Sequence, residues 1–123
     1  MIEVTVRKDG ITVSGHAGYA DPGKDIVCAG VTALTQSLVS SMKELTVNDI
    51  EYEISPGKAD IHYRDLSEAG KLLVDSFFIG ICQIADEFPD YVRIHMTMRE
   101  CLKTLRRSGV ATLNYGESQA WRL

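Results

Sequence analysis

His16 and Cys28 are the two residues of this chain whose types and spacing best suit covalent chemistry. A short loop with glycine and proline joins them, and an amphipathic helical pattern begins just before the cysteine. The N-terminus of a helix has unpaired N–H groups and partial positive charge, which stabilise a thiolate and can hold a developing oxyanion. A nearby imidazole can carry the proton to a leaving amine. This pattern is typical of a cysteine protease or an acyl transferase.

Asp25 stands at the junction of the loop and the helix and has two roles that can coexist. Its carboxylate can cap the helix N-terminus, and it can orient the imidazole of His16. The other two side chains also have ordinary structural interpretations. Cys28 can be a small buried hydrophobe of the helix, and His16 can be a solvated loop residue.

Residues 18–24 also have the spacing of a phosphate-binding loop, which is Gly, four residues, Gly and Lys between a strand and a helix. Such a site needs a Ser or Thr hydroxyl for magnesium at the next position, where this chain has Asp25. Pro22 lacks an N–H group, and Asp21 repels phosphate. These departures argue against nucleotide binding, and Lys24 is interpreted as a solvated loop charge.

The remaining cysteines and histidines do not form a metal-binding pattern. Cys82 falls on the apolar face of a helix and is expected in the core, and the role of Cys101 is open. His62 and His95 lie on strands whose sequence neighbours face the core, so both are expected on an exposed sheet face. The sequence has neither a Cys-x-x-Cys motif nor a helical histidine pair, so no metal site is predicted.

The elements that must position His16 and Cys28 follow from the apolar patterns, which predict two hairpins, each followed by a helix, and a last strand. Asp9-Gly10 is predicted as a type I′ turn because both residues accept positive φ angles. The first helix is expected to bury an apolar stripe that ends at Leu45. The predicted elements are strands 2–8, 11–15, 50–54, 61–63 and 92–98, a helix from Asp25 to about 45, and a helix from Ser67 to about 87.

Each predicted strand alternates apolar and polar residues, which favours an antiparallel or mixed sheet with one covered face. The expected fold is therefore an α/β protein of the α+β type. It is a two-layer sandwich of order ββαββαβ, with two helices packed on one face of the sheet. Both strands of the second hairpin, which turns at residues 56–58, are expected to be half-buried.

Composition and charge limit the functions that the chain can have. It has 123 residues, 45% hydrophobic and 24% charged, which is typical of one globular domain. A formal charge of -4 makes duplex nucleic acid an improbable partner. Three cysteines favour free thiols in a reducing compartment. The sequence shows no leader or membrane-spanning pattern, so a cytoplasmic protein is expected.

The charge is unevenly distributed along the chain. Residues 1–98 carry 8 basic and 15 acidic side chains, whereas residues 99–123 carry 5 basic and 2 acidic ones. We therefore expect an acidic folded domain at 1–98 and a basic C-terminal extension at 99–123, whose packing the sequence does not predict. An acidic domain can attract a basic substrate.

Three segments together resemble the signature of Prp, the family of ribosomal-processing cysteine proteases. They are Gly15-His16-Ala17-Gly18-Tyr19-Ala20, then Gly23-Lys24-Asp25-Ile26-Val27-Cys28-Ala29, then Ala33-Leu34-Thr35. The element order across about residues 1–98 also fits the small α/β domain of that family. The resemblance implies Cys28 as the nucleophile, His16 as its base and Asp25 as a supporting acidic residue. It implies three candidates for substrate contact: Gly18, Tyr19 and Thr32.

The resemblance further implies a homodimer without a cofactor that removes the N-terminal extension of a large-subunit ribosomal protein, the twenty-seventh of the L series. That extension ends in a Leu-Gln-Phe-Phe-Ala type segment before a basic N-terminus, and phage capsid or scaffold precursors are related substrates. Loop 17–24 is expected to act as a lid over the peptide. The apolar surface around Phe77, Phe78 and Ile79 is expected to form the dimer interface. The basic tail departs from the usual family ending.

Two other classes of function stay as alternatives to proteolysis. A non-catalytic module would bind ribosomal or phage assembly proteins through the acidic surface and release no product. A phosphate-binding protein would use residues 18–24, and a thermal shift with ATP and magnesium would reveal it.

Overall fold

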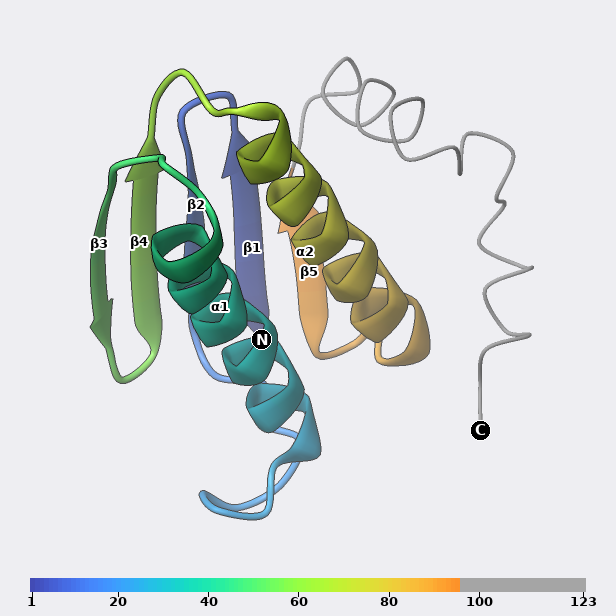
Figure 1. Cartoon of the computed structure of the whole chain (residues 1–123). Helices are drawn as coiled ribbons and strands as arrows, with labels where there is room; N and C mark the ends of the chain where they lie inside the picture. The colour runs from blue at the N-terminus through green and yellow to red at the C-terminus, as the bar shows by residue number, and fades with distance from the viewer. Residues whose placement is uncertain (96–123) are drawn as a thin grey trace.

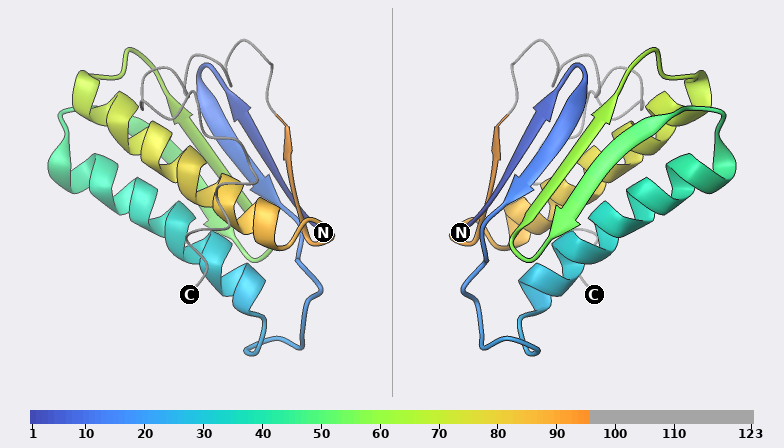
Figure 2. Two further views of the ribbon diagram at one scale, coloured as in Figure 1. Left: turned by 90° about the vertical axis from the view of Figure 1, so that its right-hand side faces the viewer. Right: turned by 90° about the vertical axis from the view of Figure 1, so that its left-hand side faces the viewer.

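The computed structural model of this chain describes residues 1–95. Five strands form one open sheet, and both helices pack on the same face of it (Figure 1). Figure 2 shows these two layers from the side. The elements, in chain order, are β1 (Ile2–Arg7), β2 (Gly10–Ser14), α1 (Ile26–Leu45), β3 (Ile50–Ser55), β4 (Lys58–Tyr63), α2 (Glu68–Glu87) and β5 (Val92–His95).

The sheet is mixed and has the strand order β3-β4-β2-β1-β5. The pairs β1–β2, β2–β4 and β3–β4 are antiparallel, whereas β1 and β5 are parallel, with Ile2 opposite Val92. α2 is the crossover that carries the chain from β4 to β5 at the other side of the sheet. The predicted order ββαββαβ and the two-layer α+β architecture are confirmed.

The core forms where alternate strand residues meet the inner faces of the helices. In β1, Ile2, Val4 and Val6 are buried, as the alternation predicts. Leu45, expected at the end of the apolar stripe of α1, is instead 70% exposed, because it is the last residue of that helix. The buried residues of α1 are Val27, Val31, Thr35, Leu38, Val39 and Met42.

The aromatic residues of α2 lie in the interior. Phe77 and Phe78 are each 3% exposed, and Ile79 is half-buried. These side chains therefore do not form the exposed dimer interface that the sequence suggested. The apolar face of α2 is wide because this helix packs against α1 as well as against the sheet.

The first hairpin turns one residue earlier than predicted. Arg7 pairs with Gly10, so the two turn residues are Lys8 and Asp9, and neither has a positive φ angle. The predicted type I′ turn at Asp9-Gly10 is therefore wrong. Gly10 is the first residue of β2, where a Cβ would collide with the carbonyl oxygen of Ile61 in β4. Glycine at this position allows β2 and β4 to approach each other closely.

The two strands of the second hairpin differ in burial, which corrects the expectation that both are half-buried. β4 alternates, with Ala59, Ile61 and Tyr63 buried. β3 is an edge strand in which Ile50 is half-buried and the other residues are exposed. The reason is visible in Figure 1, where α1 lies over the centre of the sheet and leaves β3 at the side.

Several sequence predictions concern residues outside the described part of the chain. They are strand residues 96–98, Cys101 and the basic extension 99–123. The domain boundary at residue 98 stays a prediction. Cys82, which was expected in the core, is half-buried. Neither described helix is long and apolar enough to cross a membrane.

Candidate active site

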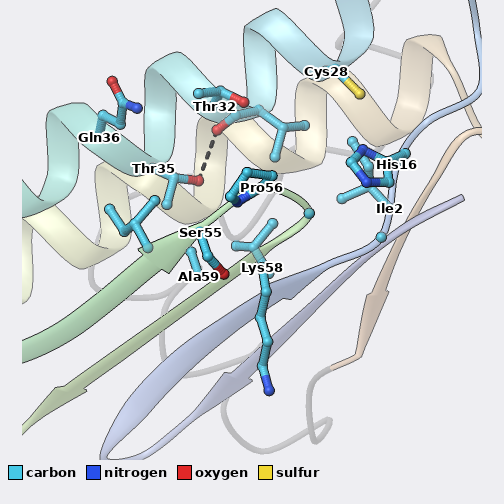
Figure 3. A pocket seen from close by; sticks show the side chains of 15 residues that line it. Ile2, His16, Cys28, Thr32, Thr35, Gln36, Ser55, Pro56, Lys58 and Ala59 are labelled. Atoms are coloured by element: carbon cyan, nitrogen blue, oxygen red, sulfur yellow. Dashed lines mark hydrogen bonds between the residues drawn. The ribbon is translucent and has the colours of Figure 1, made fainter. Parts of the chain in front are cut away.

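A cavity of about 390 Å³ opens between the first half of α1 and the turn of the β3–β4 hairpin. Its lining includes His16 and Cys28 at one end (Figure 3) and Gln36 and Ile54 further along. The structure thus brings the two reactive residues predicted from the sequence to one cavity. The loop between β2 and α1, which comprises residues 15–25, is called the connecting loop below. His16 lies near its start, and Cys28 follows its end in α1.

Cys28 lies in the first turn of α1, as predicted, and its side chain is half-buried. The backbone N–H of Ala17 donates a hydrogen bond to its sulfur, with 3.3 Å between N and Sγ. Ala17 is itself 5% exposed, so its buried position holds the amide in place. The residue next to His16 therefore contacts the cysteine directly, and its amide favours negative charge on the sulfur.

His16 is exposed, and its ring lies against the turn of the β3–β4 hairpin. Its carbonyl oxygen accepts a hydrogen bond from the backbone nitrogen of Met1, at 2.6 Å. Within residues 1–95, no hydrogen bond joins the imidazole to Cys28. The pair shares a cavity without being bonded, a looseness that is common in sites without substrate.

Asp25 caps α1, as predicted, and its two carboxylate oxygens accept hydrogen bonds from different segments. Oδ1 accepts from the backbone N–H groups of Val27 and Cys28, at 3.0 and 2.9 Å. Oδ2 accepts from the N–H groups of Tyr19 and Ala20, at 3.0 and 3.3 Å. These bonds, above all that from Cys28, hold the pKa of Asp25 below its ordinary value of 3.8. Asp25 therefore ties the connecting loop to the helix, and no hydrogen bond links its carboxylate to His16.

This cap corrects one expectation about the helix N-terminus. The N–H groups of Val27 and Cys28 are bonded to Asp25, and that of Ala29 is bonded to the carbonyl oxygen of Asp25 at 3.0 Å. These three amides, which belong to the first turn expected to hold an oxyanion, are thus already occupied. The same occupancy also leaves residues 18–24 without the helix amides that a phosphate-binding loop uses.

The three candidates for substrate contact are placed in different surroundings. Thr32 is exposed on α1 and lines the cavity one turn after Cys28. Gly18 and Tyr19 do not line it. The ring of Tyr19 packs edge-on against two other rings, with centroid distances of 5.4 Å to Phe88 and 5.2 Å to Tyr91. Tyr19 therefore anchors the connecting loop to the segment between α2 and β5.

Sequence reasoning missed the contribution of the second hairpin to the site. Ser55, Pro56 and Gly57 line the cavity, and none of them was a candidate. Figure 3 shows Ser55 and Pro56 on the side opposite α1. Pro56-Gly57 was visible only as a turn signal, because nothing in the sequence shows that this turn lies beside His16.

Other titratable residues are placed as the sequence predicted. His62 and His95 are exposed, and Nε2 of His95 lies 3.2 Å from Oε1 of Glu3. Among residues 1–95, no group of three or more His, Cys, Asp or Glu side chains could hold a metal ion.

Known proteins with the same fold and a similar sequence are cysteine proteases. The family model described as cysteine protease Prp matches residues 1–93. The ribosomal processing cysteine protease Prp of Staphylococcus aureus is 27% identical over 101 residues, covering 76% of this chain and 95% of the relative. The Bacillus subtilis protein of the same name is 23% identical over 107 residues, covering 76% and 96%.

Solved structures show the same fold. The Staphylococcus aureus ribosomal processing protease Prp with a covalently linked product peptide superposes with a TM-score of 0.71 at 22% identity, covering 78% of this chain and 97% of that one. The protein SMU.848 of Streptococcus mutans superposes with a TM-score of 0.67 at 28% identity, covering 79% and 94%. Because the family model spans most of the chain, the resemblance seen in the sequence is confirmed. The chain belongs to the cysteine protease Prp family.

Proposed function

We propose that this protein is an endopeptidase that removes the N-terminal extension of a large-subunit ribosomal protein, the twenty-seventh of the L series. Cys28 is the nucleophile and His16 is the base. One observation carries the proposal: the sulfur of Cys28, which accepts a hydrogen bond from the residue next to His16, lies in the same cavity as the imidazole. The relatives named ribosomal processing cysteine protease support the substrate class.

The reaction proceeds in two balanced steps. In the first step, His16 takes the thiol proton, and the sulfur of Cys28 attacks the carbonyl carbon of the scissile bond. The C–N bond then breaks, and the imidazolium returns the proton to the leaving amine, which leaves a thioester on Cys28. In the second step, His16 takes a proton from water, and the resulting hydroxide attacks the thioester. The carboxylic acid product leaves, and the sulfur regains a proton.

The amide of Ala17 is the donor that supports charge in this mechanism. It lies 3.3 Å from the sulfur and is held there by the burial of its own residue. In the resting protein it donates to the sulfur of Cys28. When the sulfur bonds to the substrate carbon, the carbonyl oxygen develops negative charge within reach of the same N–H group. The N–H groups of Val27 and Cys28 do not have this role, because Asp25 occupies them.

The cavity has the chemistry to receive an apolar peptide segment. Its floor contains Ile2, Val13 and Val31, and its rim carries the polar side chains of Thr32 and Gln36. The apolar floor suits the side chains of a Leu-Gln-Phe-Phe-Ala segment, and the polar rim can bond to its backbone. The surplus of acidic residues over residues 1–98 attracts the basic N-terminus that follows the cleaved bond. A solved structure of the Staphylococcus aureus ribosomal processing protease Prp contains a substrate peptide.

Three further parts of the proposal concern the working protein. The connecting loop closes over the bound peptide as a lid, with Tyr19 and Asp25 as its anchors. The enzyme works as a cytoplasmic homodimer and needs no cofactor. Related phage capsid or scaffold precursors are second substrates.

The experiment is cleavage of the ribosomal precursor, followed by mass spectrometry of the products. Cys28→Ser and His16→Ala are each expected to lower the cleavage rate by about four orders of magnitude, because the two residues act as a unit. The melting temperature is expected to stay unchanged, since Cys28 is half-buried and His16 is exposed.

Cys82→Ser is the matched control, because it removes the other cysteine of the described residues, which lies on α2. It is expected to keep full activity. Full activity in Cys28→Ser would overturn the mechanism, and binding of the precursor without any cleavage by the wild type would favour the non-catalytic binding module.

A further inference from the structure

We propose that Gly57 is a positioning residue for His16. Because Gly57 has no Cβ, the imidazole of His16 can pack directly against the backbone of the turn. This packing surface at Gly57 is called the seat below. This inference deepens the proposed function, because it depends on His16 as the base of Cys28. It assigns to a hairpin turn the orienting task that a carboxylate performs in a catalytic triad.

The seat is defined by the distances around Gly57. A Cβ built on this residue would lie 2.7 Å from Nε2 of His16, 3.1 Å from Cε1 and 3.5 Å from Cδ2. The first distance is shorter than real carbon contacts allow. The edge of the ring that carries Nε2 therefore occupies the space that any L side chain at position 57 would need.

Backbone contacts hold the turn and the histidine segment together. The N–H of Gly15 donates to the carbonyl oxygen of Gly57, with 2.9 Å between N and O. On the other side, the backbone nitrogen of Met1 donates to the carbonyl oxygen of His16. Gly15 has a φ of +93°, and a Cβ on it would collide with the carbonyl oxygen of Met1. The backbone around His16 is thus fixed from two directions before its ring is placed.

No hydrogen bond from the described residues orients the ring. Within residues 1–95 the imidazole of His16 has no hydrogen-bond partner. The carboxylate of Asp25, the acidic residue nearest in the family signature, accepts from four backbone amides instead. Contact with the turn at Gly57 therefore limits where Nε2 can lie.

The backbone conformation of the turn also favours glycine at position 57, independently of the His16 ring. A test must separate this effect from the contact with the ring. Ser55 pairs with Lys58, so Pro56 and Gly57 are the two central residues of the turn. Gly57 has a φ of +75°, which L residues other than glycine and asparagine seldom adopt. A substitution here therefore strains the turn even if the ring of His16 is absent.

The first experiment compares two alanine enantiomers at position 57 in the full chain, assembled by chemical ligation. Gly57→Ala places a Cβ against the ring, and its kcat is expected to fall about 100-fold with KM nearly unchanged, because the base is displaced by about an ångström. A D-alanine at position 57 accepts the positive φ and directs its methyl group away from the ring. It is expected to keep the kcat of the wild type. Equal loss of kcat in both variants, or full kcat in Gly57→Ala, would overturn the proposal.

The second experiment needs no activity and uses a double-mutant cycle on melting temperature. Gly57→Ala is expected to lower the melting temperature less in a His16→Ala background than in the wild type, because only the backbone strain is left when the ring is gone. An equal drop in both backgrounds would contradict the seat. Gly57→Asn, which adds the same Cβ at a φ that asparagine tolerates, serves in both experiments if Gly57→Ala fails to fold.

The two experiments also separate this inference from the proposed function. If His16→Ala keeps full activity, the proposed role of His16 as base fails, while the melting-temperature cycle still reports whether the ring rests on Gly57. If His16→Ala is inactive and the D-alanine variant loses as much activity as Gly57→Ala, the base survives and the seat fails.

Discussion

The N-termini of α1 and α2 are capped in the same way, but only that of α1 borders the candidate active site. Both helices have 20 residues and begin with a side-chain cap, Asp25 in α1 and Ser67 in α2. The hydroxyl of Ser67 accepts from the N–H of Gly70 at 3.1 Å and donates to Asn48 at 2.7 Å. The cap of α2 therefore joins that helix to the segment before β3, and its first turn contains no cysteine.

The residue at the same place after the cap shows the contrast most clearly. In α1 this third residue is Cys28, whose sulfur faces a cavity. In α2 it is Gly70, which is buried, and where a Cβ would collide with Oδ1 of Asn48. Two ends with the same helix dipole thus differ in the space in front of them. The comparison shows that a helix N-terminus becomes a site only when other elements leave a cavity there and supply the partners.

Moving the thiol is the strongest way to break this comparison. The variant Cys28→Ala with Ala69→Cys places a cysteine in the first turn of α2, at an exposed residue beside the closed position of Gly70. Cleavage is expected to fall about four orders of magnitude below wild type, because no imidazole or cavity faces the new thiol. Mass spectrometry of the cleaved precursor measures the rate. Ala69→Cys alone should keep full activity, and partial rescue by the moved thiol would mean that the dipole is sufficient.

Removing each cap sharpens the comparison. Ser67→Ala is expected to cost about 1 kcal/mol in free energy of unfolding, with no loss of kcat/KM. Asp25→Ala is expected to lower the stability further and to lower kcat/KM as well, because its carboxylate holds both α1 and the connecting loop. Denaturant unfolding and cleavage assays measure the two effects. Equal behaviour of the two variants in both assays would remove the special role of Asp25.

Low pH is expected to weaken the cap of α1 but not the cap of α2, so no mutation is needed to compare them. The folded-state pKa of Asp25 lies below 3.8, so its stabilising effect is complete above about that pH and is lost as pH falls through the lower folded value. Ser67 does not titrate in this range. Amide hydrogen exchange at Val27 and Cys28 is therefore expected to lose protection in acid before exchange at Gly70. Asp25→Asn should remove this pH dependence, and the same acid sensitivity at both ends would contradict it.

The aromatic anchor of the connecting loop is expected to have the smallest effect. Tyr19→Ala removes two edge-on ring contacts, with Phe88 and Tyr91, which are each worth about 0.5–1.5 kcal/mol in well-packed sites. Because the ring is 41% exposed, the loss in unfolding free energy is expected at the low end. Limited proteolysis of residues 17–24 should become faster, while cleavage in other loops is unchanged. Unchanged proteolysis would show that Asp25 alone holds the loop.

The fold could be predicted largely because its signals are local. Asp25 and Ser67 were identified as caps from their types and positions, and both accept hydrogen bonds from the first helical turn. The failures involve neighbours that are distant in sequence. Gly10 looked like a turn glycine, but it is needed because Ile61 of β4 approaches it. The exposure of β3 follows from its place at the sheet edge, which alternation does not reveal.

The candidate site was predicted in part for the same reason. His16, Cys28 and Thr32 lie close in sequence to the loop and the first turns of α1, and the structure places all three at the cavity. Gly18 and Tyr19 belong to the same segment but do not line it. Whether a residue near the cysteine faces the cavity depends on the path of the loop, which the contacts of Tyr19 and Asp25 decide.

By itself, the sequence determined the order of strands and helices, their caps and the two residue types that we propose as nucleophile and base. These depend on residue types and on spacing within a few positions, where backbone geometry leaves few choices. Only the tertiary structure decided that the turn at Gly57 lies against His16 and that Asp25 bonds the loop instead of the imidazole. Those contacts join segments that come together through sheet pairing and helix packing, which no local pattern encodes.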